Sequence, residues 1–233
     1  MNIIEVKNLD KSFKVGKETT RVLKNIDFTV EKGEFISIMG PSGGGKSTLL
    51  YLLGGLDKPT SGMVSINGKD LSTIKTKEMS RMRRCEMGFV FQFYNLVPNL
   101  TVEDNIMLPL ILDGKKIKDY EKKLSEILDI IGMKDKRKVT PRELSGGQQQ
   151  RVAIARALIF DPEIIFLDEP IGNLDSKTGT EIMELFRKIN LEYGKTLIQV
   201  THSSEAAQYG TSIIKLIDGE IVDRKELTVK KVG

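Results

Sequence analysis

The stretch Gly40–Pro41–Ser42–Gly43–Gly44–Gly45–Lys46–Ser47–Thr48 decides the fold of this chain. It follows the apolar run 35–39 and precedes leucines at positions 49, 50, 52 and 53, so the pattern predicts a strand, a glycine loop and a helix. In such a loop the glycines let backbone N–H groups point at a phosphate, and the helix N-terminus adds its positive dipole end. Lys46 supplies a charge for the β- and γ-phosphates, and Ser47 supplies a hydroxyl for Mg²⁺. The predicted nucleoside triphosphate site consists of Gly40, Ser42, Gly43, Gly44, Gly45, Lys46, Ser47 and Thr48.

A second apolar run, residues 164–167, ends in the two carboxylates Asp168 and Glu169. The carboxyl ends of strands are where α/β sheets bind their ligands. Alone, this pattern would fit an acidic loop after a strand equally well, but beside a phosphate-binding loop it predicts chemistry. We expect Asp168 to hold the Mg²⁺ that Ser47 contacts, and Glu169 to polarise the water that attacks the γ-phosphate.

Short apolar runs bounded by glycine or proline recur along the chain, as expected for strands buried on both faces of a parallel sheet. The predicted strands cover 3–7, part of 22–30, 35–39, 63–67, 89–91, 164–167, 197–200 and 213–217. Apolar side chains at helical spacing predict helices over 119–132 and 179–191. Strands that alternate with helices predict a three-layer α/β fold.

Two parts of the chain depart from this alternation. Residues 92–158 show mostly helical patterns, which predicts a helical subdomain inserted between two core strands. The first thirty residues and the segment 61–71 predict antiparallel strands, with a turn at Asn67–Gly68. We therefore predict a single domain of α/β class: a P-loop NTPase core with a parallel sheet and an N-terminal antiparallel β subdomain (1–91 and 159–233), and an inserted helical subdomain (92–158).

The composition excludes several classes of protein. The 36 basic and 32 acidic residues leave a net charge of +4, whereas a nucleic-acid-binding protein gathers a larger basic excess on one face. No apolar run approaches the length of a membrane span, and residues 1–5 lack the basic region and apolar core of a signal peptide. The single cysteine, Cys85, cannot form an internal disulfide and suits a reducing compartment. We expect a cytoplasmic protein that binds no nucleic acid.

The segment Leu144–Ser145–Gly146–Gly147–Gln148–Gln149–Gln150–Arg151 indicates the family. Ser145 is a good N-cap for the helix that follows, and Gly146 and Gly147 leave the start of that helix bare enough for a phosphate to approach. A plain helix start explains the serine but not two glycines and three glutamines. The segment resembles the signature sequence of ATP-binding-cassette (ABC) ATPases.

The resemblance to ABC ATPases extends over nearly the whole chain and implies roles for further residues. Gln92 matches the glutamine that contacts Mg²⁺ and the attacking water, and His202, the only histidine, matches the switch histidine that contacts the γ-phosphate. Phe13 matches the aromatic residue that stacks on adenine, and residues 172–175 resemble the D-loop, which crosses the dimer interface. Ser203 departs from the usual aspartate at its position. The catalytic residues that the resemblance and the motifs imply are Lys46, Gln92, Glu169 and His202, and the metal ligands are Ser47, Gln92 and Asp168.

The resemblance also implies partners. In this family the signature of one subunit covers the ATP held by the other, which implies a head-to-tail homodimer joined by ATP. Ser145, Gly146 and Gly147 would then serve the partner's nucleotide. A separate integral membrane permease is the second implied partner, docked near residues 93–98, and it would hold the protein at the inner face of the cell membrane.

Residues 89–92, 95–98, 101–106 and 144–156 are similar to one subgroup of the family. It comprises the ATPases of macrolide-export, lipoprotein-release and antimicrobial-peptide-resistance systems, whose permeases transmit motion across the membrane without moving substrate through it. Two other interpretations compete with this one. Soluble ABC proteins of translation or DNA repair usually carry two cassettes or a long coiled-coil insertion, for which 233 residues leave no room. A signalling or cell-division module that controls a cell-wall enzyme stays open.

Overall fold

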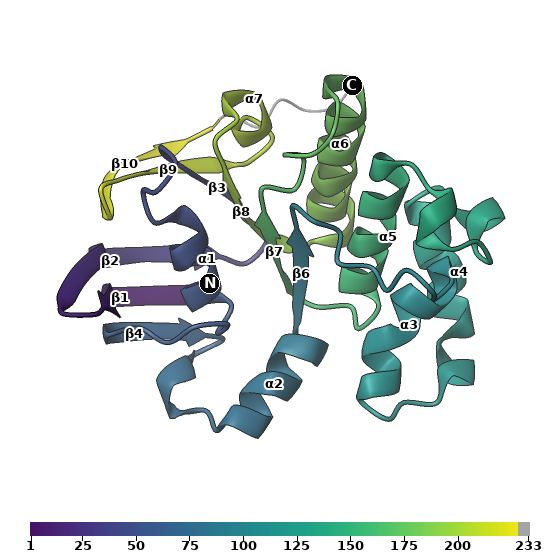
Figure 1. Ribbon diagram of the computed structural model, residues 1–233, viewed down its shortest axis with the longest axis horizontal. Helices are drawn as coiled ribbons and strands as arrows, with labels where there is room; N and C mark the ends of the chain where they lie inside the picture. Colours follow the sequence, from purple (N-terminus) through teal and green to yellow (C-terminus); the bar gives the residue numbers. More distant parts are fainter. Residues whose placement is uncertain (228–233) are drawn as a thin grey trace.

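Two β-sheets and the helices around them make up the computed structural model, which describes residues 1–227. Figure 1 shows the smaller sheet on one side of the molecule, the larger sheet in the middle and a group of helices on the other side. The last six residues of the predicted core segment 159–233 lie outside the described residues.

The smaller sheet has four antiparallel strands in the order β2-β1-β4-β5. Asn67 and Gly68 join β4 to β5, and their φ angles of 49° and 75° are the left-handed pair that a two-residue hairpin turn requires. The predicted antiparallel sheet and its turn are therefore confirmed. Its strands are β1 (Asn2–Val15), β2 (Glu18–Glu31), β4 (Ser61–Ile66) and β5 (Lys69–Asp70).

The larger sheet has six strands in the order β10-β9-β3-β8-β7-β6. Its strands are β3 (Phe35–Met39), β6 (Met87–Phe91), β7 (Ile164–Asp168), β8 (Thr196–Thr201), β9 (Ser212–Ile217) and β10 (Glu220–Glu226). Every neighbouring pair is parallel except β9 and β10, which are antiparallel. The predicted parallel sheet is thus confirmed, and β10 is an added edge strand that the apolar pattern does not predict.

The helices cover this sheet and fill the stretch between β6 and β7. Within that stretch the regular elements are α3 (Val102–Leu112), α4 (Glu121–Ile130), α5 (Gly146–Leu158) and three 3₁₀ turns, Ile117–Tyr120, Lys134–Lys136 and Pro141–Glu143. The other helices are α1 (Lys46–Leu53), the 3₁₀ turn Leu71–Thr73, α2 (Thr76–Cys85), α6 (Ser176–Tyr193) and α7 (Ser204–Ala207). The two predicted helices correspond to α4 and α6. Helix α6 begins three residues earlier than predicted because the side chain of Asp175 caps it, accepting a hydrogen bond from Thr178 N at 3.0 Å.

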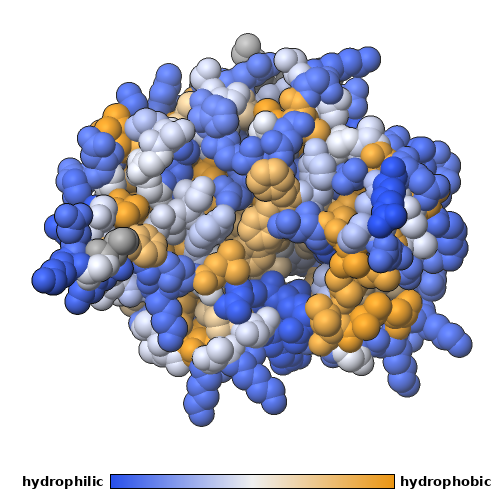
Figure 2. All heavy atoms as spheres, viewed as in Figure 1, coloured by the Kyte–Doolittle hydropathy of each residue, from blue (hydrophilic) through white to orange (hydrophobic). Residues whose placement is uncertain are grey.

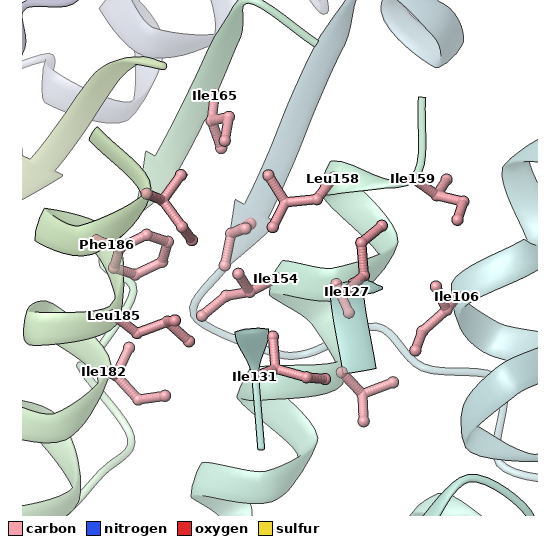
Figure 3. Close-up of a cluster of buried hydrophobic side chains, with 14 of the residues drawn as sticks. Ile106, Ile127, Ile131, Ile154, Leu158, Ile159, Ile165, Ile182, Leu185 and Phe186 are labelled. Atoms are coloured by element: carbon pink, nitrogen blue, oxygen red, sulfur yellow. The ribbon is translucent and has the colours of Figure 1, made fainter. Parts of the chain in front are cut away.

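Two apolar clusters lie on opposite faces of the larger sheet, because successive side chains of a strand point to opposite faces. In β7, Ile165 and Leu167 join the cluster of α3, α4, α5 and α6, whereas Ile164 and Phe166 join the cluster of α1 and the smaller sheet. Figure 3 shows the first cluster, in which Ile154 and Leu158 of α5 lie between side chains of α6 and Ile106 of α3. Each fully buried side chain of this size contributes about 1.5–3 kcal/mol, so the clusters hold both sheets and all the large helices in place.

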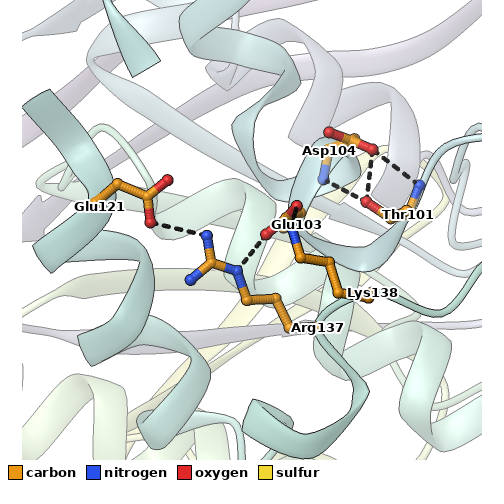
Figure 4. Close-up of polar contacts among 6 residues, drawn as sticks. All are labelled: Thr101, Glu103, Asp104, Glu121, Arg137 and Lys138. Carbon is orange, nitrogen blue, oxygen red and sulfur yellow. Dashed lines mark hydrogen bonds and ion pairs between the residues drawn. The ribbon is translucent and has the colours of Figure 1, made fainter. Parts of the chain in front are cut away.

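A polar network fixes α3 at its start (Figure 4). Thr101 and Asp104 form a reciprocal capping box at the N-terminus of α3, with Asp104 N donating to Thr101 Oγ1 at 3.2 Å. Glu103 accepts hydrogen bonds from Arg137 and Lys138, and Arg137 also donates to Glu121 Oε2 of α4 at 2.8 Å. The network joins α3, α4 and the segment before α5, so these helices keep one arrangement.

Candidate nucleotide-binding site

Four strands of the larger sheet end at the same edge. The register partners there are Met39 and Thr201, Val200 and Asp168, and Asp168 and Phe91. Because these strands are parallel, the residues that come next in each chain segment also meet at this edge. Those residues are Gly40, Gln92, Glu169 and His202. The structure therefore brings together four segments that the sequence places up to 162 positions apart.

The loop between β3 and α1 has a backbone that only glycine accommodates. Gly43 and Gly45 have φ angles of 78° and 93°, in the left-handed region. A Cβ on Gly40 would lie 2.0 Å from the carbonyl oxygen of Leu216, so that position has no room for a side chain. Lys46 is only 7% exposed, and its Nζ donates to the carbonyls of Gly40 and Pro41, each at 3.0 Å. The ammonium group thus lies across the loop, where it can exchange these carbonyls for phosphate oxygens.

Asp168 contacts α1 through both of its carboxylate oxygens. Ser47 Oγ, one of the predicted metal ligands, donates to Oδ1 at 3.0 Å, and the hydroxyl of Tyr51 donates to Oδ2 at 2.6 Å. The hydrogen bond to Asp168, burial and the negative charge of Asp168 together raise the pKa of Tyr51 to about 12. Sequence reasoning missed Tyr51, although its position four residues after Ser47 places both side chains on one face of a helix.

Glu169 and His202 face each other at the sheet edge. His202 Nδ1 lies 3.0 Å from Glu169 Oε2, and the backbone N–H of His202 donates to the same oxygen at 3.4 Å. The side chain of His202 is 66% exposed, whereas that of Glu169 is 17% exposed. Glu169 has a φ of 46°, which is uncommon for a residue with a side chain and occurs where surrounding structure forces it. This backbone places the carboxylate just beyond the end of β7, facing His202.

Gln92 is held by the D-loop. Its Nε2 donates to Asn173 Oδ1 at 3.1 Å, and Asn173 Nδ2 donates back to the carbonyl of Gln92 at 3.0 Å. A Cβ on Gly172 would lie 2.9 Å from Gln92 Nε2, so a glycine is needed for this contact. Ser203, at the position where aspartate is usual, caps α7, since its Oγ accepts a hydrogen bond from Ala206 N at 3.1 Å. Ser203 therefore has a structural role as the cap of α7.

The signature segment begins α5 as predicted. Ser145 Oγ accepts from Gln148 N at 3.3 Å, and Gln148 Oε1 accepts from Ser145 N at 3.0 Å, which completes a capping box. A Cβ on Gly147 would lie 2.2 Å from Thr178 Cγ2 of α6. Close packing within the chain therefore requires this glycine, a reason that sequence reasoning missed. Figure 1 shows α5 and α1 on different sides of β6 and β7, so the chain does not bring its own signature to its own phosphate loop.

Phe13 lies on β1, in the smaller sheet. Its side chain is 40% exposed, and Lys11 Nζ lies 4.7 Å from the centroid of its ring. This cation–π contact fixes one face of the ring. An exposed aromatic ring of this kind can stack on a base.

The oxygens of Ser47 and Asp168 fit Mg²⁺. This cation prefers hard oxygen ligands and is usually held by one or two protein groups together with phosphate oxygens and water. A hydroxyl and a carboxylate 3.0 Å apart, next to a phosphate loop, are such a set. The side-chain amide of Gln92 bonds to Asn173.

The sequence profile of the ABC transporter family matches residues 23–172. The chain belongs to the ABC transporter family. As a member it is an ATP-binding cassette with ATPase activity, and the predicted fold, function class and resemblance are confirmed.

Three relatives describe the place of this cassette in the family. It is similar to the ATP-binding cassette MJ0796 of Methanocaldococcus jannaschii, in a dimeric structure of a post-hydrolysis state bound to ADP and Pi. The TM-score is 0.87 and the sequence identity 44%, and the match covers 97% of this chain and 100% of that one. It is 46% identical to the macrolide export ATP-binding/permease protein MacB of Mannheimia succiniciproducens, covering 96% of this chain and 34% of that protein. It is 41% identical to the lipoprotein-releasing system ATP-binding protein LolD 1 of Rhodopseudomonas palustris, covering 94% of this chain and 98% of that protein.

The cassette has an apolar groove of about 410 Å³ in front of β6, between α2 and α3. Figure 2 shows apolar side chains gathered over α3 beside a hollow on this face. Phe89, Phe91, Leu108 and Leu112 line the groove, together with arginines that include Arg84. Arg156 of α5 also lines the groove. Its guanidinium donates to the carbonyl oxygens of Tyr94 at 2.8 Å and Asn95 at 2.6 Å, so the segment after Gln92 is held beside the groove. Among residues 1–227, no helix combines the length and the apolar character needed to cross a membrane.

Proposed function

We propose that two copies of this cassette close head to tail around ATP, and that each nucleotide is held by the phosphate loop of one copy and the signature of the other. The observation that carries this proposal is the separation of α1 from α5 in one chain (Figure 1). Ser145, Gly146 and Gly147 then serve the partner's nucleotide, with the bare start of α5 offering its N–H groups and positive dipole end. The dimeric state of the relative that binds ADP and Pi supports this arrangement.

Within each composite site, Lys46 and the N–H groups of residues 40–48 hold the phosphates, and Ser47 and Asp168 hold Mg²⁺ together with Gln92. When bound, Mg²⁺ neutralises charge on the phosphates. Glu169 is the general base, because its carboxylate sits at the strand end where an attacking water would lie. His202 bonds to the same carboxylate and reaches the γ-phosphate from its exposed position, and Phe13 stacks on the adenine.

Residues 92–158 act as the helical subdomain and residues 1–91 and 159–233 as the core, with a permease docked between them. The groove in front of β6 supports this, since it lies between core elements and α3 and is lined by apolar rings and by arginines. A short apolar helix with an acidic residue is complementary to such a groove. The likeness to MacB and LolD 1 supports a partner of the macrolide-export or lipoprotein-release type. The cassette would then work at the inner face of the membrane, bound to that permease.

Size measurement by light scattering tests the dimer. The Glu169→Gln variant should be monomeric alone and dimeric with ATP and Mg²⁺, because ATP binds but is not hydrolysed. Lys46→Ala in the same background is the matched control and should stay monomeric, since it lacks the charge that holds the phosphates. A Glu169→Gln variant that stays monomeric at high concentration with ATP contradicts the proposal.

Co-purification from membranes tests the partner. The tagged cassette should carry a membrane protein with it, and identification of that protein distinguishes a transport system from a signalling or cell-division complex. Recovery of the cassette without any membrane protein argues against a permease-coupled role.

A further inference from the structure

Both oxygens of the Asp168 carboxylate accept a hydrogen bond from α1. Ser47 Oγ donates to Oδ1 at 3.0 Å, and the hydroxyl of Tyr51 donates to Oδ2 at 2.6 Å. The two donors are four residues apart and share one face of the helix. Only Ser47 belongs to the metal site proposed above, so the second donor needs its own explanation.

The ring of Tyr51 is held independently of this hydrogen bond. It is half-buried and packs against the apolar cluster between α1 and the two sheets. Its backbone carbonyl accepts a hydrogen bond from Leu56 N at 2.8 Å, which closes the end of α1. A ring fixed in this way brings its hydroxyl to one point in space, and that point is Oδ2 of Asp168.

We infer that Tyr51 is a positioning residue for the metal site: its hydroxyl fixes Oδ2 of Asp168, so that Oδ1 and Ser47 Oγ face the Mg²⁺ of the nucleotide. This inference rests on the proposed role of Ser47 and Asp168 as Mg²⁺ ligands. The terminal torsion of an aspartate is broad, so a carboxylate without this bond samples other orientations. Mg²⁺ demands near-ideal octahedral geometry and therefore loses affinity when a ligand rotates. Partners that bond to metal-ligating groups typically change metal affinity by about 10- to 100-fold when they are removed.

The test is the affinity of the Tyr51→Phe protein for Mn²⁺, used as a paramagnetic substitute for Mg²⁺. The full-length protein is saturated with ADP, which is not hydrolysed, and free Mn²⁺ is followed by electron paramagnetic resonance. Phe keeps the packed ring and removes only the hydroxyl. Tyr209→Phe is the matched control, because it removes a hydroxyl that lies near the carboxylate of Glu184 and leaves the hydrogen bond from Tyr51 to Asp168 in place. ADP affinity in EDTA and the melting temperature are measured on the same samples.

We expect Tyr51→Phe to weaken Mn²⁺ binding by about 10- to 100-fold, with ADP affinity in EDTA and the melting temperature unchanged. Tyr209→Phe should match the wild type throughout. Mn²⁺ affinity equal to or tighter than that of the wild type overturns the inference, and so does a joint loss of ADP affinity and thermal stability. If the wild type itself binds no ADP, or binds Mn²⁺ equally well without ADP, the proposed nucleotide site fails first, and this inference fails with it.

Discussion

Replacing Gly147 by alanine is a direct test of how closely α5 and α6 pack. The new Cβ would lie 2.2 Å from Thr178 Cγ2, whereas carbon atoms in ordinary contact are about 3.5–4.0 Å apart. Thr178 cannot simply rotate, because its Oγ1 donates to Asp175 Oδ2 at 2.7 Å and its backbone N–H donates to Oδ1 at 3.0 Å. Rotation would break a bond to a charged group that contributes about 1.5–3 kcal/mol. Moving the helices apart instead costs about 1–3 kcal/mol, as overpacking does.

The opposing effect is smaller. Alanine is favoured over glycine in a helix by about 1 kcal/mol, and less near the first turn. The net expectation for Gly147→Ala is a loss of about 1–2 kcal/mol, which for a chain of this size lowers the melting temperature by about 2–8 °C. Thr178→Ser removes Cγ2 and keeps the hydroxyl, so the double variant should recover most of that loss in a thermal denaturation experiment. Gly147→Ala melting at the wild-type temperature, or no recovery in the double variant, refutes the reasoning.

The same pair of variants separates packing from nucleotide binding. In the stable double variant the added methyl group points at α6, so it leaves the N–H groups at the start of α5 open to the partner's phosphate. We expect ATP-dependent dimerisation in the Glu169→Gln background to return together with thermal stability. If the dimer stays impaired although the fold is restored, Gly147 also serves the partner's nucleotide directly.

Three further predictions concern turnover, acid stability and docking. His202→Ala should keep ATP binding and lose about 10²–10³-fold in phosphate release, as loss of one charge-stabilising donor does, and near-normal release would contradict its proposed role. Burial alone would raise the pKa of Glu103, but hydrogen bonds from Lys138 and Arg137 outweigh it and hold that pKa below its usual range. A carboxylate whose pKa is lowered by folding stabilises the protein at pH values above its unfolded pKa of about 4.3, and this stabilisation is lost as the pH falls. In melting curves between pH 7 and 3, Glu103→Gln should therefore be less stable than the wild type at pH 7 and approach the stability of the wild type on acidification. A difference in stability that does not change with pH would argue against this network. The side chain of Phe93 is 68% exposed, so Phe93→Ser should leave the isolated protein folded and reduce its co-purification with the permease. Undiminished recovery of the complex would place the docking site elsewhere.

Docking is better tested at Phe93 than at its neighbours. Leu96 packs against the buried cluster of the helices, so a polar residue there would disturb the fold as well as the surface. Tyr94 lies under the signature, since a Cβ on Gly146 would be 2.8 Å from its hydroxyl oxygen. The apolar character of residues 93–98 therefore reflects core packing at some positions and an exposed surface at others.

The strands buried on both faces were predictable, and the exposed ones were not. β3 and β7 are nearly continuous apolar runs, and their predicted bounds agree with the structure to within one residue. β10 has five charged residues among seven and only partial burial, because it pairs at the edge of the sheet with β9 alone. α2 escaped prediction for a similar reason: its only buried side chains are Met79 and Met82, and basic residues dominate the rest.

The candidate site was predictable where one short segment carries a whole function. A motif of nine residues or fewer identifies each of three parts of the site: the phosphate loop, the carboxylates after β7 and the start of α5. Contacts between segments were not predictable in the same way. The bond from Tyr51 to Asp168 spans 117 positions and that from Gln92 to Asn173 spans 81, so both depend on how the strands align. The place of Gly147 against Thr178 likewise depends on the distance between two helices.

The left-handed backbone at Glu169 lowers folding stability at the same position whose side chain is proposed to act in ATP hydrolysis. A φ of 46° costs a residue with a side chain of order 1 kcal/mol or more, and glycine would adopt the same angle without that cost. Selection for a higher melting temperature alone would therefore favour glycine at this position and discard the carboxylate on which hydrolysis is proposed to depend. Laboratory evolution of a more thermostable cassette would therefore need a screen for ATP turnover alongside selection for heat resistance. Without that screen it would yield a stable protein that binds ATP but does not hydrolyse it.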